Sequence, residues 1–198
     1  MINRADPTIV KVRATINFPK LYEPETDPWG RTRYACEFRV KDPADWAKIE
    51  AAKEAAWKKK DPANWQKLLK KTNADPKLCL LRLPDDFDEL EENERYKVMN
   101  LSRRPEDGMP ELLGPDLHKV AQSEGLFVSG AEVFVLFSVW AFTGKGSTGC
   151  SGTMLGLQFI KAGPSLGGAA KKASADDFEK LEQDEADVDP FAEEKVPF

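Results

Sequence analysis

The chain has 198 residues, of which 41% are hydrophobic and 32% are charged, with a formal net charge of -5, and this size predicts one domain with appendages. No apolar run approaches the roughly 20 residues of a membrane-spanning helix, and residues 1–13 lack the apolar block of a signal peptide, so we expect a cytoplasmic protein, neither integral to a membrane nor secreted. Three separated cysteines without a C-x-x-C pair and a single histidine, His118, exclude a disulfide framework and a standard zinc site and argue against most enzymes, so we expect no catalytic residue, no metal and no cofactor.

Alternating side chains predict two strands near the N-terminus. The first covers residues 8–18 and directs five apolar side chains inward: Val10, Val12, Ala14, Ile16 and Phe18. Pro24, Pro28 and Gly30 predict a loop over residues 19–30. The second strand covers residues 31–40 and directs inward Tyr34, Cys36, Phe38 and Val40. Both strands therefore have one apolar and one polar face.

The pattern then changes to that of helices. Asp42-Pro43 and Asp61-Pro62 each read as a helix cap followed by proline at the first helical position, which predicts helices over 43–59 and 62–71. Their tryptophans, Trp46, Trp57 and Trp65, are candidates for stacking on bases, but the helical spacing favours packing against the barrel.

The second half of the chain adds three further strands. Residues 132–142 give the clearest pattern, because Val133, Val135, Phe137 and Val139 alternate with side chains that are also apolar. The other expected segments are an acidic surface loop at 84–94, a strand at 95–103, a short helix at 112–124, a turn at 144–149 and a strand at 150–161.

Five strands and a helical insertion predict a mainly β fold, a five-stranded barrel of the OB type, with a β-sandwich as the alternative. The expected domain covers residues 1–162, with the helical insertion at about 43–72.

An OB barrel binds single strands with a basic groove that follows phosphates and with aromatic rings on which bases stack. The candidate DNA-binding residues on the expected strands and loops are Lys11, Arg13, Trp29, Arg31, Arg33, Tyr34, Arg39, Tyr96, Lys97, Arg103, Trp140 and Lys145. A solvated sheet face is the alternative for the cations. Core packing is the alternative for the rings, and it is favoured for Phe38, Phe134 and Phe137.

Charge is distributed unevenly along the chain. Residues 174–198 hold ten acidic and two basic residues, so they carry -8, while residues 1–173 carry +3. We expect residues 163–175, rich in Gly, Ala, Ser and Lys, to be a flexible linker, and residues 176–198 to be a disordered acidic tail. Apolar residues within that tail, and its Val196-Pro197-Phe198 end, suggest a docking segment rather than a solubility tail. The candidate partner-binding residues are Asp187, Asp189, Phe191, Pro197 and Phe198.

Two segments carry a resemblance to a known family. Residues 149–163, which read Gly-x-Ser-Gly-x-x-Leu-Gly-Leu-Gln-Phe-Ile-Lys-x-Gly, resemble the last barrel strand of phage single-stranded DNA-binding proteins. The Val-Pro-Phe end is similar to the Ile-Pro-Phe end of bacterial single-stranded DNA-binding proteins.

The resemblance implies sequence-independent binding of single-stranded DNA during phage replication and recombination, in the cytoplasm of the host cell, by a monomer or homodimer. It also implies a tail that recruits replication proteins, such as a polymerase or a helicase/primase, and that competes with DNA for the groove.

Two other classes of protein remain as alternatives. The carboxylates of residues 84–94 provide the ligand type of a metal-dependent nuclease, but they crowd into one expected loop. An adaptor that binds a protein partner through the acidic tail, without DNA, is the other alternative.

Overall fold

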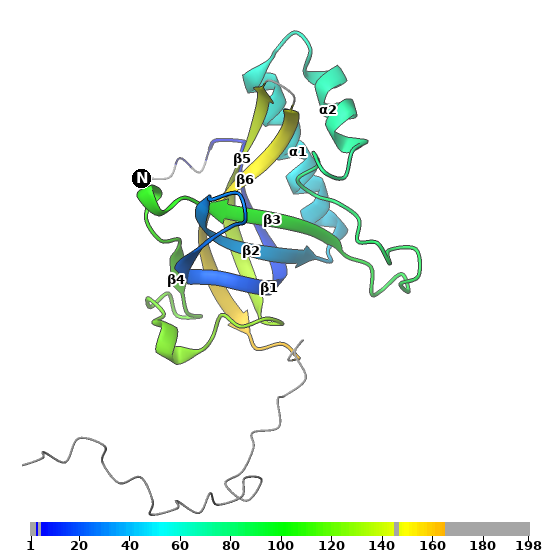
Figure 1. Ribbon diagram of the computed structural model, residues 1–198. Helices are drawn as coiled ribbons and strands as arrows, with labels where there is room; N and C mark the ends of the chain where they lie inside the picture. Colours follow the sequence, from blue (N-terminus) through cyan, green and yellow to red (C-terminus); the bar gives the residue numbers. More distant parts are fainter. Residues whose placement is uncertain (1–2, 4, 145–146, 165–198) are drawn as a thin grey trace, which may run out of the picture. The chain divides into compact units, whose positions relative to one another are not determined.

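The computed structural model describes residues 3, 5–144 and 147–164, and the described part of the chain forms a closed barrel of five strands (Figure 1). The barrel strands are β1 (Ile9–Thr26), β2 (Thr32–Val40), β3 (Lys97–Arg103), β5 (Glu132–Gly144) and β6 (Ser147–Lys161). They pair in the order β3-β2-β1-β5-β6, and a parallel pairing of Ser102 with Thr153 joins β6 back to β3. The predicted OB-like barrel is therefore confirmed, and the alternative of a sandwich is wrong.

Two helices separate β2 from β3, as predicted. Helix α1 (Pro43–Lys60) begins where the Asp42 carboxylate accepts a hydrogen bond of 2.8 Å from the Ala44 amide. Helix α2 (Trp65–Asn73) begins three residues later than predicted, because the Asp61 carboxylate accepts from the Asn64 amide at 3.1 Å and holds residues 62–64 in a turn. Figure 1 shows both helices beside the far end of the β5–β6 hairpin, where α1 contacts β5 and α2 contacts β6. No helix within the described ranges has the length and apolarity that crossing a membrane requires.

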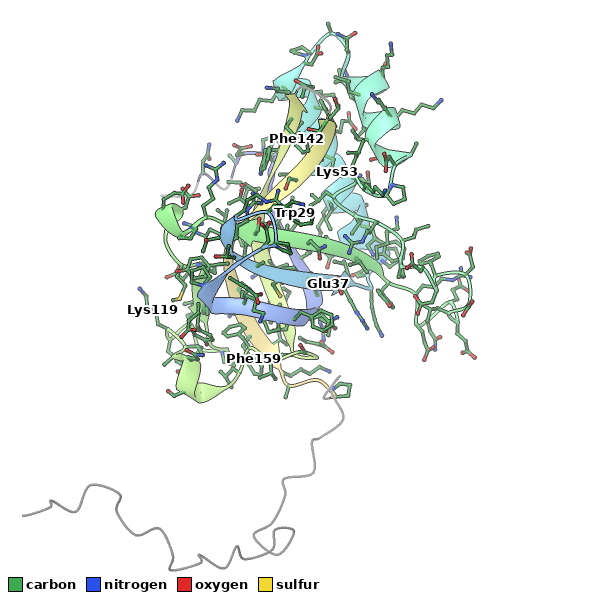
Figure 2. The ribbon with its side chains drawn as sticks, viewed as in Figure 1. Trp29, Glu37, Lys53, Lys119, Phe142 and Phe159 are labelled. Carbon is green, nitrogen blue, oxygen red and sulfur yellow. The ribbon has the colours of Figure 1, made fainter. Side chains whose placement is uncertain are left out.

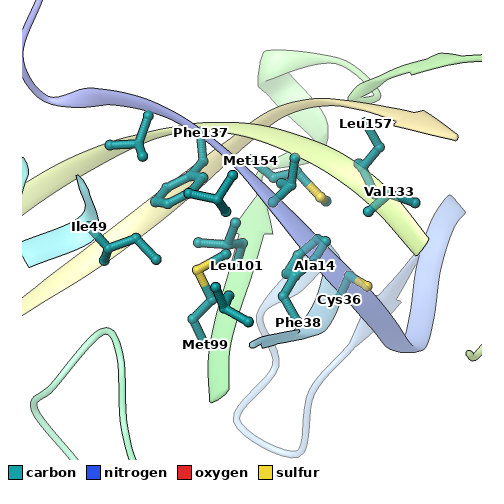
Figure 3. Packing of buried hydrophobic residues seen from close by; sticks show 14 of the residues in the cluster. Ala14, Cys36, Phe38, Ile49, Met99, Leu101, Val133, Phe137, Met154 and Leu157 are labelled. Atoms are coloured by element: carbon teal, nitrogen blue, oxygen red, sulfur yellow. The ribbon is translucent and has the colours of Figure 1, made fainter. Parts of the chain in front are cut away.

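The core fills the barrel and extends beneath α1. Figure 3 shows Phe38 and Leu101 packed among the strands with Phe137 and Met154, and Ile49 of α1 beside them. Trp57 of α1 is also fully buried, so this tryptophan packs as its helical spacing indicated. Complete burial of each such side chain stabilises the fold by about 1.5–3 kcal/mol.

The predicted loop over residues 19–30 is largely wrong, because β1 continues to Thr26. The ladder with β2 skips register between Asn17 and Lys20 and again before Glu25, so β1 bends rather than ends. Pro19 has no backbone N–H to donate and sits at the first irregularity, where a β-ladder tolerates proline. The true turn is short and closes at Gly30, whose φ is 78°.

Phe18 is exposed, although strict alternation along β1 predicted that it faces the core. Its side chain is 71% exposed and its φ is 47°. The register irregularity directly after Asn17 breaks the two-residue period on which the prediction rested.

The predicted helix over residues 112–124 is also wrong. The short strand β4 (Glu111–Leu113) pairs in parallel with β6, with Leu112 opposite Leu157. Gly114 and Pro115 end this strand, and the only helical turn in the segment is a 3-10 turn over Gln122–Glu124, which Gly125 closes with φ 62°. Leu112 and Val120 of the segment reach the core from a strand and a loop instead of a helix, while Leu117 is exposed.

The β5–β6 hairpin is longer than predicted. Its ladder runs to the pair Gly144 and Ser147, so both strands continue into the expected turn at 144–149.

Candidate nucleic-acid interface

The outer face of the barrel carries an open groove of about 790 Å³ that crosses β1 and β2. Strand register assembles it, since Thr15 of β1 lies opposite both Arg39 of β2 and Glu132 of β5. The side chains that line it include the cations Arg13, Arg39 and Lys41, the ring of Tyr96, and the acids Asp42, Glu94 and Glu132. Three predicted DNA-binding residues, Arg13, Arg39 and Tyr96, are thus brought together.

Arg39 lines this groove and stacks on an aromatic ring. Its guanidinium carbon lies 5.0 Å from the centre of the Tyr96 ring. Its Nε is buried and donates to no acceptor in the described part of the chain. Among the same residues neither Arg39 nor Lys41 forms an ion pair. Both cations are therefore available to an anionic ligand.

Arg13 is held more tightly. Its backbone amide donates to the buried Asp45 carboxylate of α1 at 2.9 Å, which fixes β1 against the first turn of that helix. Its guanidinium pairs with Glu132, which also receives the Lys161 ammonium at 3.3 Å. Burial opposes ionisation of Glu132, but the hydrogen bonds from Arg13 and Lys161 outweigh burial and lower its pKa. A phosphate that binds Arg13 thus competes with an ionised carboxylate.

Two further cations on the barrel surface lie over aromatic rings. The Lys11 ammonium is 4.3 Å from the centre of the Phe134 ring, and the Lys97 ammonium is 4.8 Å from that of Trp46. Phe134 is only partly buried on the outer face of β5, so its assignment to the core was wrong. Alternation with the buried Val133 and Val135 was the signal that placed it outside.

Trp29 lies at the tip of the β1–β2 hairpin and is 77% exposed (Figure 2). The Arg31 guanidinium lies 5.1 Å from its ring centre, and Arg31 Nε donates to the Asp27 carboxylate at 2.6 Å. Burial opposes ionisation of Asp27, but hydrogen bonds from Arg31 and from the Trp29 amide lower its pKa overall. The hairpin tip therefore presents an exposed ring beside a cation whose orientation is fixed.

The remaining predicted residues do not form one patch with the groove. Tyr34 packs partly buried against the core, and Arg33 donates to the Ser102 hydroxyl at 3.4 Å. Arg103 donates to the carbonyl oxygens of Gly108 at 2.7 Å and Met154 at 3.2 Å.

Trp140 lies further along β5, 46% exposed, with its ring centre 5.4 Å from that of Phe142 (labelled in Figure 2). Lys145 and the tail residues Asp187, Asp189, Phe191, Pro197 and Phe198 lie outside the described residues.

Two charged residues of the outer face escaped the sequence analysis, and one of them, Lys41, lines the groove. Lys41 directly follows β2, and its place next to a strand with outward arginines was a usable signal. Glu37 lies on β2 (Figure 2), and its carboxylate accepts from Asn17 Nδ2 at 3.1 Å and pairs with Arg82 at 3.4 Å. The register between β1 and β2 places Asn17 opposite Glu37, and the bridge between Arg82 and Val98 of β3 brings Arg82 beside β2.

The acidic segment 84–94 borders the groove through Leu90 and Glu94. Within the part of the chain that the structure covers, no three Asp, Glu, His or Cys side chains are grouped so that they could hold a metal ion.

A family model described as the ssDNA-binding protein of Enterobacter phage Enc34 matches residues 8–189. Among curated protein sequences no match is found.

Solved structures similar to this one include the single-stranded DNA-binding protein from bacteriophage Enc34 in complex with ssDNA. It has 15% identity and a TM-score of 0.65 over 84% of this chain and 97% of that chain. A C-terminal truncation of the Enc34 protein has 14% identity and a TM-score of 0.61 over 83% and 96%. Gp2.5, a single-stranded DNA-binding protein encoded by bacteriophage T7, has 11% identity and a TM-score of 0.51 over 87% and 98%. At these identities the structures establish a shared fold.

Proposed function

We propose that this chain, which belongs to the family of the Enterobacter phage Enc34 ssDNA-binding protein, binds single-stranded DNA along the outer face of its barrel without reading base sequence and without catalysis. The observation that carries the proposal is the groove in which Arg39 stacks on Tyr96 beside Lys41. A cation next to an aromatic ring provides the two contacts that a single strand offers everywhere, a phosphate and the face of a base.

The groove suits weak, sequence-independent contacts. The unpaired cations Arg39 and Lys41 bind phosphates directly, whereas Arg13 binds a phosphate in place of the Glu132 carboxylate. Because no base edge is read in such contacts, affinity depends on salt and length far more than on sequence.

Groove variants test the proposal. The double variant R39Q/K41Q removes two cations, so the slope of log affinity against log salt falls by about 1.4, at about 0.7 per phosphate contact. The control variant K77Q/K119Q removes the same charge from exposed lysines that do not line the groove, and it leaves the slope unchanged. Fluorescence anisotropy with a labelled oligothymidine measures both slopes. Equal slopes for the two double variants would exclude this groove.

The acidic tail supplies the proposed regulation. Pro164 lines the groove, so the chain leaves the barrel at the binding face, and residue 176 follows only 12 residues later. Twelve residues reach at most about 40 Å, so a short tether joins the segment with ten acidic side chains, which begins at Asp176, to the groove and gives it a high effective concentration there. The tail thus competes with DNA as a polyanion.

The same tail supplies the proposed partner contacts. Acidic residues and the rings of Phe191 and Phe198 suit a basic, apolar pocket on a replication protein such as a polymerase or a helicase/primase. On this proposal the protein acts as a monomer or homodimer in phage replication and recombination, in the cytoplasm of the host cell.

A further inference from the structure

Phe18 combines two features that are unfavourable for a large apolar side chain. It is 71% exposed, and its φ of 47° lies in the left-handed region. Residues other than Gly, Asn and Asp seldom adopt that region, because Cβ then crowds the backbone. Such strain persists only where the surrounding structure imposes it, and it concentrates at ligand-binding positions.

The surrounding structure does impose this conformation. Phe18 occupies the register irregularity of β1 between Asn17 and Lys20, and its amide donates to the Ser129 hydroxyl at 3.0 Å. Next to it, the Gly130 amide donates to the Ile16 carbonyl at 2.9 Å, and the Ile16 amide donates to the Ala131 carbonyl at 2.9 Å. Bulges of this kind redirect a side chain from one face of a strand to another.

Phe18 is close to groove residues both along β1 and through its hydrogen bond to Ser129. Thr15, three residues earlier on β1, and Gly130, adjacent to Ser129, both line the groove. Lys20, two residues further along β1, is an exposed cation that pairs with Glu25 at 3.5 Å. Phe18 therefore lies where the groove meets the bent part of β1.

We propose that Phe18 is a base-stacking platform at this end of the groove, and this inference rests on the proposed binding of single-stranded DNA. The ligand it takes is the face of an unpaired base, which the register irregularity makes accessible by turning the ring out of the core. In duplex DNA the same base face is covered by its neighbours, so the contact selects single strands.

Leu117 provides the comparison within the same chain. It too has a positive φ, of 68°, and is 63% exposed. Its conformation is explained by the turn in which its amide donates to the Gly114 carbonyl at 3.1 Å. Its side chain is aliphatic and its neighbour Asp116 is acidic, so it lacks both contacts that a single strand requires.

The substitution F18N tests the inference, with L117N as the matched control. Asparagine tolerates the left-handed region, so neither variant loses stability in urea denaturation. We expect F18N to bind an oligothymidine about 5- to 150-fold more weakly, as for the loss of one stacked base. The salt slope stays the same because no phosphate contact is lost. L117N binds as the unsubstituted chain does, and F18W restores the affinity.

An abasic oligonucleotide of the same length completes the test. Since it has no base to stack, F18N and the unsubstituted chain bind it equally. A loss of affinity for both oligonucleotides, or for neither, overturns the role of Phe18. The role is also overturned if F18N changes the sedimentation coefficient but not the affinity for either oligonucleotide, because the Phe18 ring then packs against a second copy of the chain. If the unsubstituted chain binds no single strand at all, the proposed function fails instead.

Discussion

Single arginines on neighbouring strands perform different tasks in this barrel. Arg39 stacks on Tyr96 and keeps an unpaired donor, whereas Arg103 donates to backbone carbonyls of Gly108 and Met154. In the sequence both arginines belong to expected strands, and both are therefore equally good candidates for binding DNA. The surroundings separate them, because a guanidinium already bonded to carbonyls has few donors left for a phosphate.

We predict that R103A lowers the free energy of unfolding by about 1–3 kcal/mol, because the part-buried Met154 carbonyl and the Gly108 carbonyl lose a charged donor. The neighbouring R104A removes only a surface pair with Glu106 at 3.5 Å, and its effect stays within about 0.5 kcal/mol. Urea denaturation of both variants measures the difference. Equal stabilities would show that Arg103 does not hold β3 to β6.

At the scale of elements, local patterns predicted the segments that obey one period. β5 followed from the alternation of Val133 and Val135, and α1 followed from the Asp42-Pro43 cap. β1 failed beyond Asn17 because a register irregularity changes which face each side chain occupies. Residues 112–124 failed because pairing with β6, a contact distant in sequence, decides their conformation.

The sequence predicted that the candidate site combines cations with aromatic rings, but it did not predict which residues meet in the groove. The alternation of apolar and polar side chains along β1 and β2 predicted that Arg13 and Arg39 point outward. Their meeting with Lys41 and Tyr96 depends on the pairing of strands that are distant in sequence, which no local pattern contains. The strained backbone and exposed ring of Phe18 follow from the same register irregularity that made the strand prediction wrong.

The connection between β4 and β5 contains a pH-sensitive contact. His118 Nε2 lies 3.0 Å from the Glu124 carboxylate, and Nδ1 faces Asp116. The hydrogen bonds with Asp116 and Glu124 raise the pKa of His118, while those with His118 and the Ala121 amide lower the pKa of Glu124. The contact thus stabilises the fold while His118 is protonated and both carboxylates are ionised.

The raised pKa of His118 determines how stability changes with pH. Because the folded pKa of His118 is raised, its contribution is fully present below the unfolded value of about 6.5 and is lost as pH rises through the folded pKa. We predict that the unsubstituted chain loses more stability between pH 6 and pH 9 than H118Q does, in urea denaturation. Parallel losses in the two proteins would show that the contact contributes nothing to folding.

At the scale of the whole molecule, the fold persists while the sequence diverges. The Enc34 protein shares 15% of its residues with this chain at a TM-score of 0.65. Barrel closure requires apolar side chains inside the strands and permits wide change outside. The resemblance stated from the last strand is confirmed by the family model over residues 8–189.

Charge divides the molecule into a body of +3 and a C-terminal segment, residues 174–198, of -8. We predict that deletion of residues 174–198 tightens binding to single-stranded DNA, mostly at low salt, where screening of the competing polyanion is weakest. Deletion of Phe198 alone leaves this affinity almost unchanged and abolishes capture of the proposed replication partner. Equal low-salt affinities for the full-length and truncated chains would rule out competition.

The central claim is that the outer face of the barrel binds single strands and not duplexes. The most direct measurement is the affinity of the full chain for one labelled oligonucleotide, alone and annealed to its complement, across a salt series. We predict strong preference for the single strand, an affinity that falls steeply with salt, and little change when the base sequence is scrambled. Equal affinity for the duplex, or dependence on one defined sequence, would contradict the account.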